Sequence, residues 1–320
     1  LRFIMKKIIV GISSCLLGEK VRYDGGHKFD HFLAITLGQF FEYYPLCPEV
    51  ECGLPVPREA MHLVMSDNSI RLLGIKSKTD FTHSMRNWAE QKLKEMENLN
   101  LCGFIFKSRS PSSGMERVKI YSENGKLLNK SGVGIFAEMF MKKFPLMPVE
   151  EEGRLQDPLL RENFIERVFA YYRWRIFLEE HYSLSGLMDF HASHKLLLMA
   201  HSPAHYRDCG RIVASAAKDN LSEVSNSYFE VFMDGLKKIA TVSKNCNVLH
   251  HLLGYFKKVL TPSEKEEMLY LIEQYRQGFI PLIVPVTMIN HYVSKYNEPY
   301  LKRQYYLNPH PVELKLRNHA

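Results

Sequence analysis

The sequence has 320 residues, 46% hydrophobic and 24% charged, which is the composition of an ordinary globular protein and is long enough for two domains. No apolar run is long enough to span a bilayer, and no signal-peptide pattern stands at the start, where residues 1–4 resemble a short extension before a natural start at Met5. The formal net charge of +7 is compatible with a polyanionic partner without establishing one, and we expect a soluble cytoplasmic protein.

The first two cysteines each follow a predicted strand. Residues 6–13 are rich in β-branched side chains and bounded by glycine and serine, which is typical of a short buried strand and places Cys15 at its carboxyl end. Residues 30–40 have the apolar positions of a helix, and residues 40–46 predict a second strand that delivers Cys47 to its own carboxyl end. Ligands of open α/β sheets bind at this edge.

The stretch at residues 45–58 combines prolines, two acids and two cysteines. Proline fixes φ and removes a backbone donor, so we expect a stiff loop with no regular element. Such a loop is either the mount for a chemical site or a surface crossover whose cysteines are buried. Six cysteines in a chain of this length do not make a disulfide scaffold, and their concentration in the first third favours a thiol or metal role for Cys15, Cys47, Cys52 and Cys102.

The remainder of the first domain is predicted to alternate strands and helices. A hairpin or irregular segment at 67–78 precedes a helix at 82–99, and a buried strand at 102–107 ends in the hydroxyl-rich loop 108–114. A short strand at 118–121, a turn at 123–126 and a helix at 135–144 follow. Three strand-end loops should therefore converge, and they carry Cys15, Cys47 with Glu49, and the serine run.

Residues 145–153 predict the boundary between domains, because strand signals disappear after them. Helices are expected from Asp157-Pro158, which has an N-cap acid and proline at the first helical position, and from the capping box that starts at Thr261. Further helices are expected at 187–199, 203–217, 228–242, 248–260 and after Pro285. The predicted fold is an α/β domain with a mostly parallel sheet at 1–148, followed by an all-α domain at 149–320.

The ordered motifs of the first domain resemble those of the thiouracil desulfidase family. These motifs are Ser13-Ser14-Cys15-Leu16-Leu17-Gly18 with Arg22-Tyr23-Asp24-Gly25, then Cys47-Pro48-Glu49, then Lys107-Ser108-Arg109-Ser110-Pro111-Ser112-Ser113-Gly114. Residues 157–320 resemble the YbgA-type family, through His191, through 194–203 and through 301–309. The two-domain combination is similar to the bacterial desulfidases that remove sulfur from 4-thiouridine in transfer RNA.

The resemblance implies a [4Fe–4S] cluster that three cysteines hold, with one iron open to the sulfur of the substrate. A thiocarbonyl is a soft ligand and a thiolate-bound iron is a soft Lewis acid, so the chemistry is coherent. Water must then replace sulfur at the ring carbon, which needs a base and a proton donor. Glu49 and Ser110 match the catalytic glutamate and serine of the family. The alternative for Glu49 is a carboxylate that caps a helix or pairs with Arg58.

One position departs from the family pattern. Where the family has its third cysteine ligand, this sequence has Ser113, and serine is a poor ligand for soft metals. Either the cluster is lost or another cysteine replaces this ligand. Cys52 belongs to the same loop as Cys47, whereas Cys102 lies at the far end of its strand, about 17 Å away. We therefore predict Cys15, Cys47 and Cys52 as the metal ligands.

Polar residues around the predicted site are candidates for binding the substrate. Arg22 or Lys107 could hold a phosphate or orient a base, and the alternative for both is a solvated charge at a strand end. The substrate-binding residues that we predict are Arg22, Asp24, Lys107, Ser112 and Ser113.

The second domain offers weaker signals. One group of histidines lies close together in the sequence: His191, His194, His201 and His205. We interpret them as a polar helical face that contacts substrate or the other domain, in preference to a metal site. Cys209 and Cys246 are expected to be core thiols. The tail interleaves aromatic and basic residues, as proteins that recognise single-stranded RNA often do, or it docks onto the helical domain: Tyr300, Lys302, Arg303, Tyr305, Tyr306, Arg317 and Asn318.

Three hypotheses follow. The first is an iron–sulfur enzyme that desulfurates a thiolated uracil base, with 4-thiouridine in transfer RNA as the leading substrate. The second is a nucleic-acid-binding module whose cluster is lost, as Ser113 suggests. The third is a free-thiol or zinc protein that uses Cys47 and Cys52.

Overall fold

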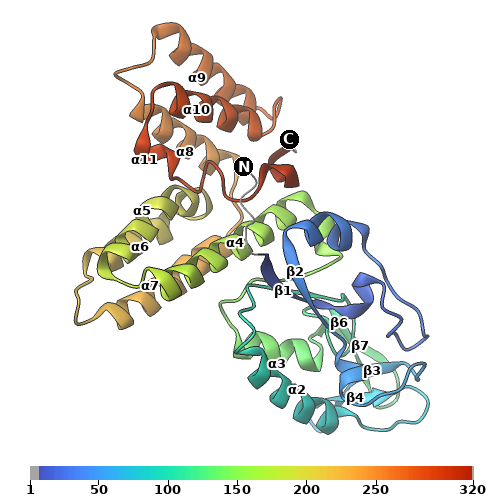
Figure 1. Cartoon of the computed structure of the whole chain (residues 1–320). Helices are drawn as coiled ribbons and strands as arrows, with labels where there is room; N and C mark the ends of the chain where they lie inside the picture. The colour runs from blue at the N-terminus through green and yellow to red at the C-terminus, as the bar shows by residue number, and fades with distance from the viewer. Residues whose placement is uncertain (1–6, 319–320) are drawn as a thin grey trace. The chain divides into compact units, whose positions relative to one another are not determined.

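A computed structural model describes residues 7–318, so the predicted start at Met5 lies outside the described residues. The chain divides into two compact units, Leu1–Gln156 and Asp157–Ala320. The predicted fold class is confirmed, because the first unit combines a parallel sheet with helices and the second is built from helices (Figure 1). The division falls later than the predicted residue 148, because part of the expected linker is a strand of the first unit.

The main sheet of the first unit is parallel throughout. Its strands are β1 (Ile8–Ser13), β2 (Phe41–Leu46), β5 (Phe104–Phe106) and β8 (Val149–Glu151), in the order β2-β1-β5-β8. Gly11 in β1 pairs with Phe104, and a Cβ on this glycine would lie 2.2 Å from the Phe104 ring. The missing side chain therefore lets β5 pack closely, and the carboxyl ends of all four strands reach one edge.

A second sheet packs the rest of the first unit. It contains β3 (Met61–Ser66), β4 (Ser69–Gly74), β6 (Val118–Ser122) and β7 (Leu127–Gly132), in the order β4-β3-β6-β7. The hairpin between β3 and β4 turns at Asp67 and Asn68, whose φ angles of 47° and 59° are left-handed. The sequence predicted no strand at β7, because five of its six residues are exposed and give no buried alternation.

The first unit contains three α-helices within the described residues. They are α1 (Pro48–Glu51), α2 (Thr82–Met96) and α3 (Ile135–Lys143). The helix predicted at 30–40 is instead a π-helical turn, Phe32–Thr36, followed by a 3₁₀ turn, Leu37–Gln39. The expectation that 45–58 contains no regular element is wrong, because Pro48–Glu51 forms one helical turn.

The second unit is a set of packed helices with defined starts. They are α4 (Pro158–Glu180), α5 (Leu184–His201), α6 (Pro203–Ala214), α7 (Leu221–Lys237), α8 (Val242–Tyr255), α9 (Pro262–Arg276), α10 (Ile283–Lys295) and α11 (Pro299–Lys302). The Asp157 side chain accepts from the amides of Leu159 and Leu160, and Thr261 forms the predicted capping box with Glu264.

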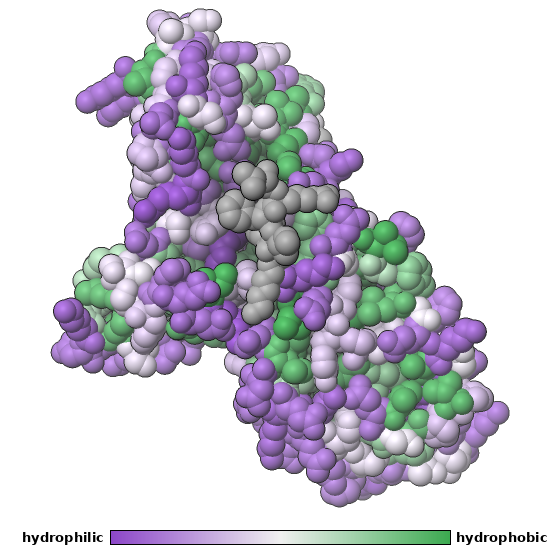
Figure 2. Space-filling model, in the orientation of Figure 1, coloured by the Kyte–Doolittle hydropathy of each residue, from purple (hydrophilic) through white to green (hydrophobic). Residues whose placement is uncertain are grey.

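The helices of the described residues can be compared with the requirements for crossing a membrane. None of the helices there combines the length and the apolar content that crossing a bilayer requires. On the face drawn in Figure 2, hydrophilic and hydrophobic residues are interspersed over both units.

A buried ionic network ties the end of the chain to the helices of the second unit. Arg317 is 5% exposed and donates to Glu166 Oε1 at 2.7 Å and to Glu162 Oε1 at 3.0 Å. On the other side of Glu166, His201 Nε2 lies 3.0 Å from Oε2. Burial alone would raise the pKa of Glu166, but the neighbouring Arg317 and His201 lower it overall. The last turn of the chain is therefore held by charge as well as by apolar packing.

Removing Arg317 should destabilise the second unit strongly. Arg317→Ala leaves Glu166 buried without its strongest partner, which typically costs about 3–5 kcal/mol. Arg276, whose side chain is 64% exposed beside Glu273, gives the matched control, and Arg276→Ala should destabilise the unit far less because solvent screens an exposed ion pair. Urea unfolding followed by helical circular dichroism measures both, and equal losses would contradict the role assigned to Arg317.

Candidate active site

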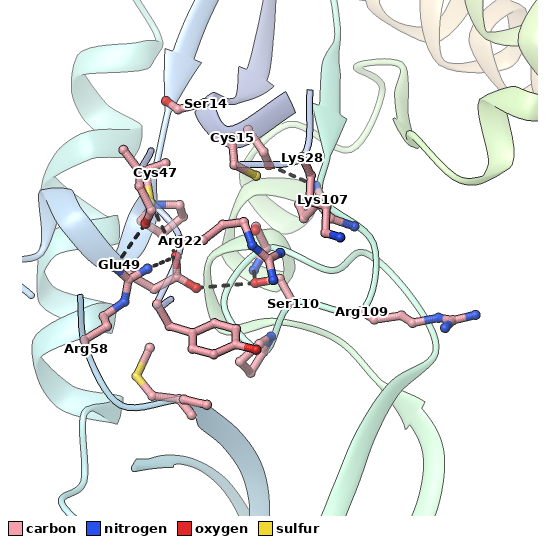
Figure 3. A pocket seen from close by; sticks show the side chains of 18 of the residues that line it. Ser14, Cys15, Arg22, Lys28, Cys47, Glu49, Arg58, Lys107, Arg109 and Ser110 are labelled. Carbon is pink, nitrogen blue, oxygen red and sulfur yellow. Dashed lines mark hydrogen bonds and ion pairs between the residues drawn. The ribbon is translucent and has the colours of Figure 1, made fainter. Parts of the chain in front are cut away.

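A cavity of about 360 Å³ opens at the carboxyl edge of the parallel sheet. Figure 3 shows its side chains, with Cys15 and Cys47 on one side and Glu49 and Ser110 facing each other. The residues predicted from the sequence that line it are Cys15, Arg22, Cys47, Glu49, Lys107, Ser110 and Ser113.

Each wall of the cavity follows a strand of the parallel sheet. Cys15 lies in a 3₁₀ turn directly after β1, and Cys47 directly follows β2. The serine loop, which we define as residues 108–114, comes soon after β5. The structure therefore brings together the three strand-end loops that were expected to converge.

The two cysteines that line the cavity are nearly buried. Cys15 is 8% exposed and Cys47 is 9% exposed. Burial raises the pKa of Cys15 to about 11, although Lys107 opposes the shift. Burial and then the Glu49 carboxylate raise the pKa of Cys47 to about 12. A metal that binds these sulfurs would have to displace their protons, because the thiolate is the ligand.

Glu49 connects the thiols to the serine loop. Its Oε1 accepts from Ser112 Oγ at 2.6 Å and from Ser110 Oγ at 3.4 Å. Its Oε2 accepts from Arg58 Nη2 at 3.0 Å and from Cys47 Sγ at 3.4 Å. The alternative pairing of Glu49 with Arg58 is thus present, and the same carboxylate also lies in the wall of the cavity.

The serine loop is fixed by its own backbone. Ser110 Oγ accepts from the amides of Ser112 at 3.3 Å and Ser113 at 3.2 Å. The loop also packs against the start of α3, where a Cβ on Gly134 would lie 2.5 Å from the carbonyl carbon of Ser112. The hydroxyl of Ser110 is therefore held in a defined position beside Glu49.

The predicted substrate-binding residues divide between the cavity and its rim. Arg22 lines the cavity, and Asp24 lies outside the lining, 3.3 Å from Arg22 Nε. The Gly26 amide and then Arg22 lower the pKa of Asp24. Lys107 donates to the carboxylate of Glu152, the residue directly after β8. Ser112 is fully buried and reaches the site through its hydrogen bond to Glu49.

The structure does not bring Cys52 to the cavity, so the predicted reach of this thiol is not observed. Its Sγ donates to the Glu49 carbonyl at 3.2 Å, and its side chain packs against the apolar cluster that contains Leu63 and Met85. The turn of helix at Pro48–Glu51 rotates the chain between Cys47 and Cys52, which explains the difference. Cys102 is buried and is also absent from the cavity lining.

Sequence reasoning missed two residues around the cavity, Lys28 and Glu152, and named a third, Arg58, only as a partner of Glu49. Arg58 donates from Nη1 to the Val21 carbonyl at 3.0 Å and so ties the 45–58 segment to the first loop. Lys28 lines the cavity, and its amide donates to the Cys15 carbonyl at 2.9 Å. Glu152 accepts from the Ser108 amide at 2.7 Å. Glu152 was assigned to the linker, and no local pattern indicated the three-residue strand before it.

The four histidines of the second unit have separate partners. His191 lies 3.3 Å from the Tyr228 hydroxyl, and His205 lies 3.0 Å from Asp234. His194 contacts the Phe190 carbonyl through Nδ1 at 2.8 Å, whereas His201 contacts Glu166. Within residues 7–318 the four histidines do not lie together as one group of potential metal ligands.

The tail docks onto the helices of the second unit. Tyr306 is fully buried, and Arg317 is held by Glu162 and Glu166. Arg303 is paired with Asp189 at 2.9 Å. The tail residues predicted to recognise RNA are therefore partly used for packing, as the docking alternative expected. Cys209 and Cys246 are buried free thiols, as predicted.

The contact between Gly134 and the serine loop gives a test of the site's architecture. Gly134 has φ −64° and ψ 144°, which alanine tolerates, so Gly134→Ala acts through the clash with Ser112. We expect a loss of about 1–3 kcal/mol and faster hydrogen exchange at the amide of Phe136, which donates to Ser112. Gly153→Ala is the control, because its Cβ would lie 3.8 Å from Ser108 Oγ. Equal exchange in both variants would contradict the packing described.

Comparisons with known proteins give separate matches for the two parts of the chain. The model of the 2-thiouracil desulfurase family matches residues 10–152, and that of the DUF1722 family of unknown function matches residues 195–311. The uncharacterized protein YbgA of Escherichia coli (strain K12) is 32% identical over 153 residues, which are 48% of this chain and 90% of YbgA. The uncharacterized protein YbbK of Bacillus subtilis (strain 168) is 28% identical over 127 residues, 38% of this chain and 83% of YbbK.

One solved structure is also similar. It is the [4Fe-4S]-dependent thiouracil desulfidase TudS, at 29% identity and a TM-score of 0.38, with 47% of this chain and 94% of TudS covered. The family resemblance predicted from the motifs is confirmed. The chain belongs to the YbgA family, and its residues 10–152 match the model of the 2-thiouracil desulfurase family while residues 195–311 match that of the DUF1722 family.

Proposed function

We propose that this protein is an iron–sulfur-dependent desulfidase that removes sulfur from a thiolated uracil base, and that 4-thiouridine in transfer RNA is its substrate. The observation that carries the proposal is the cavity itself. It places two buried thiols, Cys15 and Cys47, beside a carboxylate that is hydrogen-bonded to Ser110 and Ser112. Membership in the 2-thiouracil desulfurase family supports the reaction class.

The donor atoms of the cavity fit an iron–sulfur cluster at two positions. Cys15 and Cys47 supply soft sulfur, while the third position offers the harder oxygen of Ser113, which lines the same cavity. Cys52 lies outside this wall, so we move the proposed third ligand from Cys52 to Ser113. When bound there, the cluster would supply an open iron that is soft enough to take up the sulfur of a thiocarbonyl.

The surrounding residues supply the proton transfers that the reaction requires. The carbon–sulfur double bond is replaced by a carbon–oxygen bond from water, and the sulfur leaves as hydrogen sulfide, so no net oxidation or reduction occurs. Glu49 acts as the general base and takes a proton from the attacking water, while Ser110 passes a proton to the nucleobase. Arg58 and Ser112 hold the two oxygens of Glu49 in fixed directions.

The second unit and the charge support a polynucleotide substrate over a free base. The DUF1722 domain adds a helical unit to the desulfidase domain, and the net charge of +7 favours a polyanion. In this proposal the helical unit grips the transfer RNA. Its place of action is the cytoplasm, where free thiols such as the six cysteines of this chain persist.

A second candidate function is a nucleic-acid-binding module without a cluster. The observation that favours it is Ser113, because two thiolates and one hydroxyl bind iron less tightly than three thiolates. Under this candidate the cavity persists as a base-binding pocket without chemistry.

The ligand assignment can be checked by anaerobic purification and by counting iron and sulfide per chain. Cys15→Ala and Cys47→Ala should abolish the brown colour, whereas Cys52→Ala should retain it. Ser113→Cys should raise the iron content and slow its loss to a chelator, because sulfur is the softer ligand.

A colourless wild-type protein would favour the second candidate, and zinc alone would favour a thiol–zinc site. Loss of iron in Cys52→Ala, with retention in Ser113→Ala, would restore Cys52 as the ligand.

The proton-transfer roles can be separated from cluster binding. Glu49→Gln keeps the shape of the side chain and removes the base, so sulfide release from thiolated transfer RNA should fall by about 10²–10⁴-fold at unchanged iron content. Glu59→Gln is the control, since Glu59 lines the cavity but its carboxylate accepts from the amides of Lys76 and Ser77.

If the two variants released sulfide equally fast, Glu49 would not be the base. If wild-type protein with a full cluster released no sulfide from thiolated transfer RNA, the substrate assignment would be wrong.

A further inference from the structure

A second and larger hollow of the first unit adjoins the active-site cavity. It measures about 1050 Å³, and we call it the basic groove. Part of its lining is shared with the active-site cavity, through Met61, Lys107, Ser108, Arg109 and Pro111. A ligand bound in the cavity could therefore continue into the groove past the serine loop.

The groove carries an excess of positive charge. Its cationic lining residues are Lys107, Arg109, Arg117, Lys119, Lys130 and Arg154, against one acid, Glu151. Glu151 is 2% exposed and accepts from the amides of Met115 at 3.0 Å and Glu116 at 3.4 Å, so its charge is directed into the protein. The open side of the groove is therefore strongly basic.

Three of these cations are available to a ligand. Lys107 pairs with Glu152, while Arg117 and Arg154 both pair with Glu116 at 2.9 Å. Arg109, Lys119 and Lys130 are exposed, and none of them has an ion pair with another described residue. They come from the serine loop, β6 and β7.

The arrangement of these cations has a cost that a bound anion would offset. β6 and β7 are antiparallel neighbours, with Ile120 opposite Asn129, so Lys119 and Lys130 lie on adjacent strands close to the same level. Like charges at such positions repel each other. A phosphate between them would remove the repulsion.

Arg109 lines both hollows, and its side chain extends away from Glu49. Figure 3 shows its side chain extending outward while the adjacent Ser110 faces Glu49. The backbone of Arg109 has φ +59°, a left-handed conformation that a residue with a long side chain rarely adopts. This strained conformation sends the side chains of two consecutive residues in different directions: Ser110 lines the active-site cavity alone, whereas Arg109 lines both the cavity and the groove.

The groove also has an aromatic surface. The rings of His62 on β3 and Tyr121 on β6 lie 5.2 Å apart and are tilted by 35°, and both line the groove. Burial and the nearby Lys78 lower the pKa of His62, which favours a neutral ring. Sites for single-stranded nucleic acid combine such rings, on which bases stack, with cations that follow the backbone.

We infer that the basic groove binds the RNA strand that flanks the thiolated base, with Arg109, Lys119 and Lys130 on its phosphates and the His62–Tyr121 pair against a neighbouring base. This inference rests on the proposed function, because it takes the base to lie in the active-site cavity. A free thiobase has no phosphate and gains nothing from the groove. The groove thus makes the first unit itself selective for a polynucleotide.

The test uses the full chain with Lys119→Gln and Lys130→Gln combined, since neither lysine lines the active-site cavity. The matched control combines Lys94→Gln and Lys142→Gln, which removes the same charge from exposed positions of the first unit outside both hollows. The probe is a labelled single-stranded oligoribonucleotide without sulfur, measured by fluorescence anisotropy across a salt series.

The groove variant should bind the RNA more weakly than the control. The slope of log affinity against log salt should also become shallower by about 1.4, roughly 0.7 for each lost phosphate contact. Arg109→Gln should weaken binding in the same direction. Sulfide release from free 4-thiouridine should be equal in wild type, groove variant and control.

The outcomes separate this inference from the proposed function. Equal RNA affinity and equal salt slope in the groove variant and the control would overturn the inference that the groove binds RNA. Slower turnover of free 4-thiouridine in the groove variant alone would also overturn it, because the lysines would then act on the base itself. Absence of sulfide release from every substrate would defeat the proposed reaction, whereas the RNA measurement would still decide whether the groove binds a strand.

Discussion

The parallel alignment of β1, β2, β5 and β8 is the constraint on which the site depends. Because the four strands run in one direction, the residues that follow them meet at one edge, although those after β1 and β8 are separated by nearly the full length of the first unit. Register is fixed by close packing at β1, where Gly11 makes room for the Phe104 ring. A slip of one residue would turn Cys15 away from Cys47, since side chains alternate along a strand.

Within this frame, one ion pair organises the loop that supplies most of the chemistry. Arg58 reaches Glu49 through Nη2 and the Val21 carbonyl through Nη1, so it joins both ends of the 45–58 segment to the loop after β1. The side chain of Arg58 is only 6% exposed, which makes the pair less sensitive to solvent screening than a surface pair. The stiffness of this segment thus comes from a buried cation as well as from its prolines.

The sequence predicted those parts of the site that depend on apolar runs. Cys15 and Cys47 each follow a predicted strand, so their meeting could be expected from the rule that parallel strands end at one edge of a sheet. Glu49 lies two residues beyond Cys47 and was predicted with it. Cys52 was misplaced because a single helical turn at 48–51 leaves no periodic signal, yet it decides which way the next side chain faces. Glu152 was missed because the three residues of β8 include two acids, and this strand is stabilised by pairing with β5. Such short elements owe their existence to tertiary contacts.

The side chain at position 113 affects the affinity of the cavity for metal without determining the shape of the cavity. The serine loop is held by Ser110 Oγ, which accepts from two amides, and by the backbone contact of Ser112 with Gly134. Neither contact uses the side chain at position 113, so the loop folds in the same way whether that side chain ends in oxygen or sulfur. The choice of atom therefore changes the softness of one donor while the distances among Glu49, Ser110 and Cys47 stay fixed. Catalytic geometry and cluster stability can thus vary independently in this fold, and position 113 is where they separate.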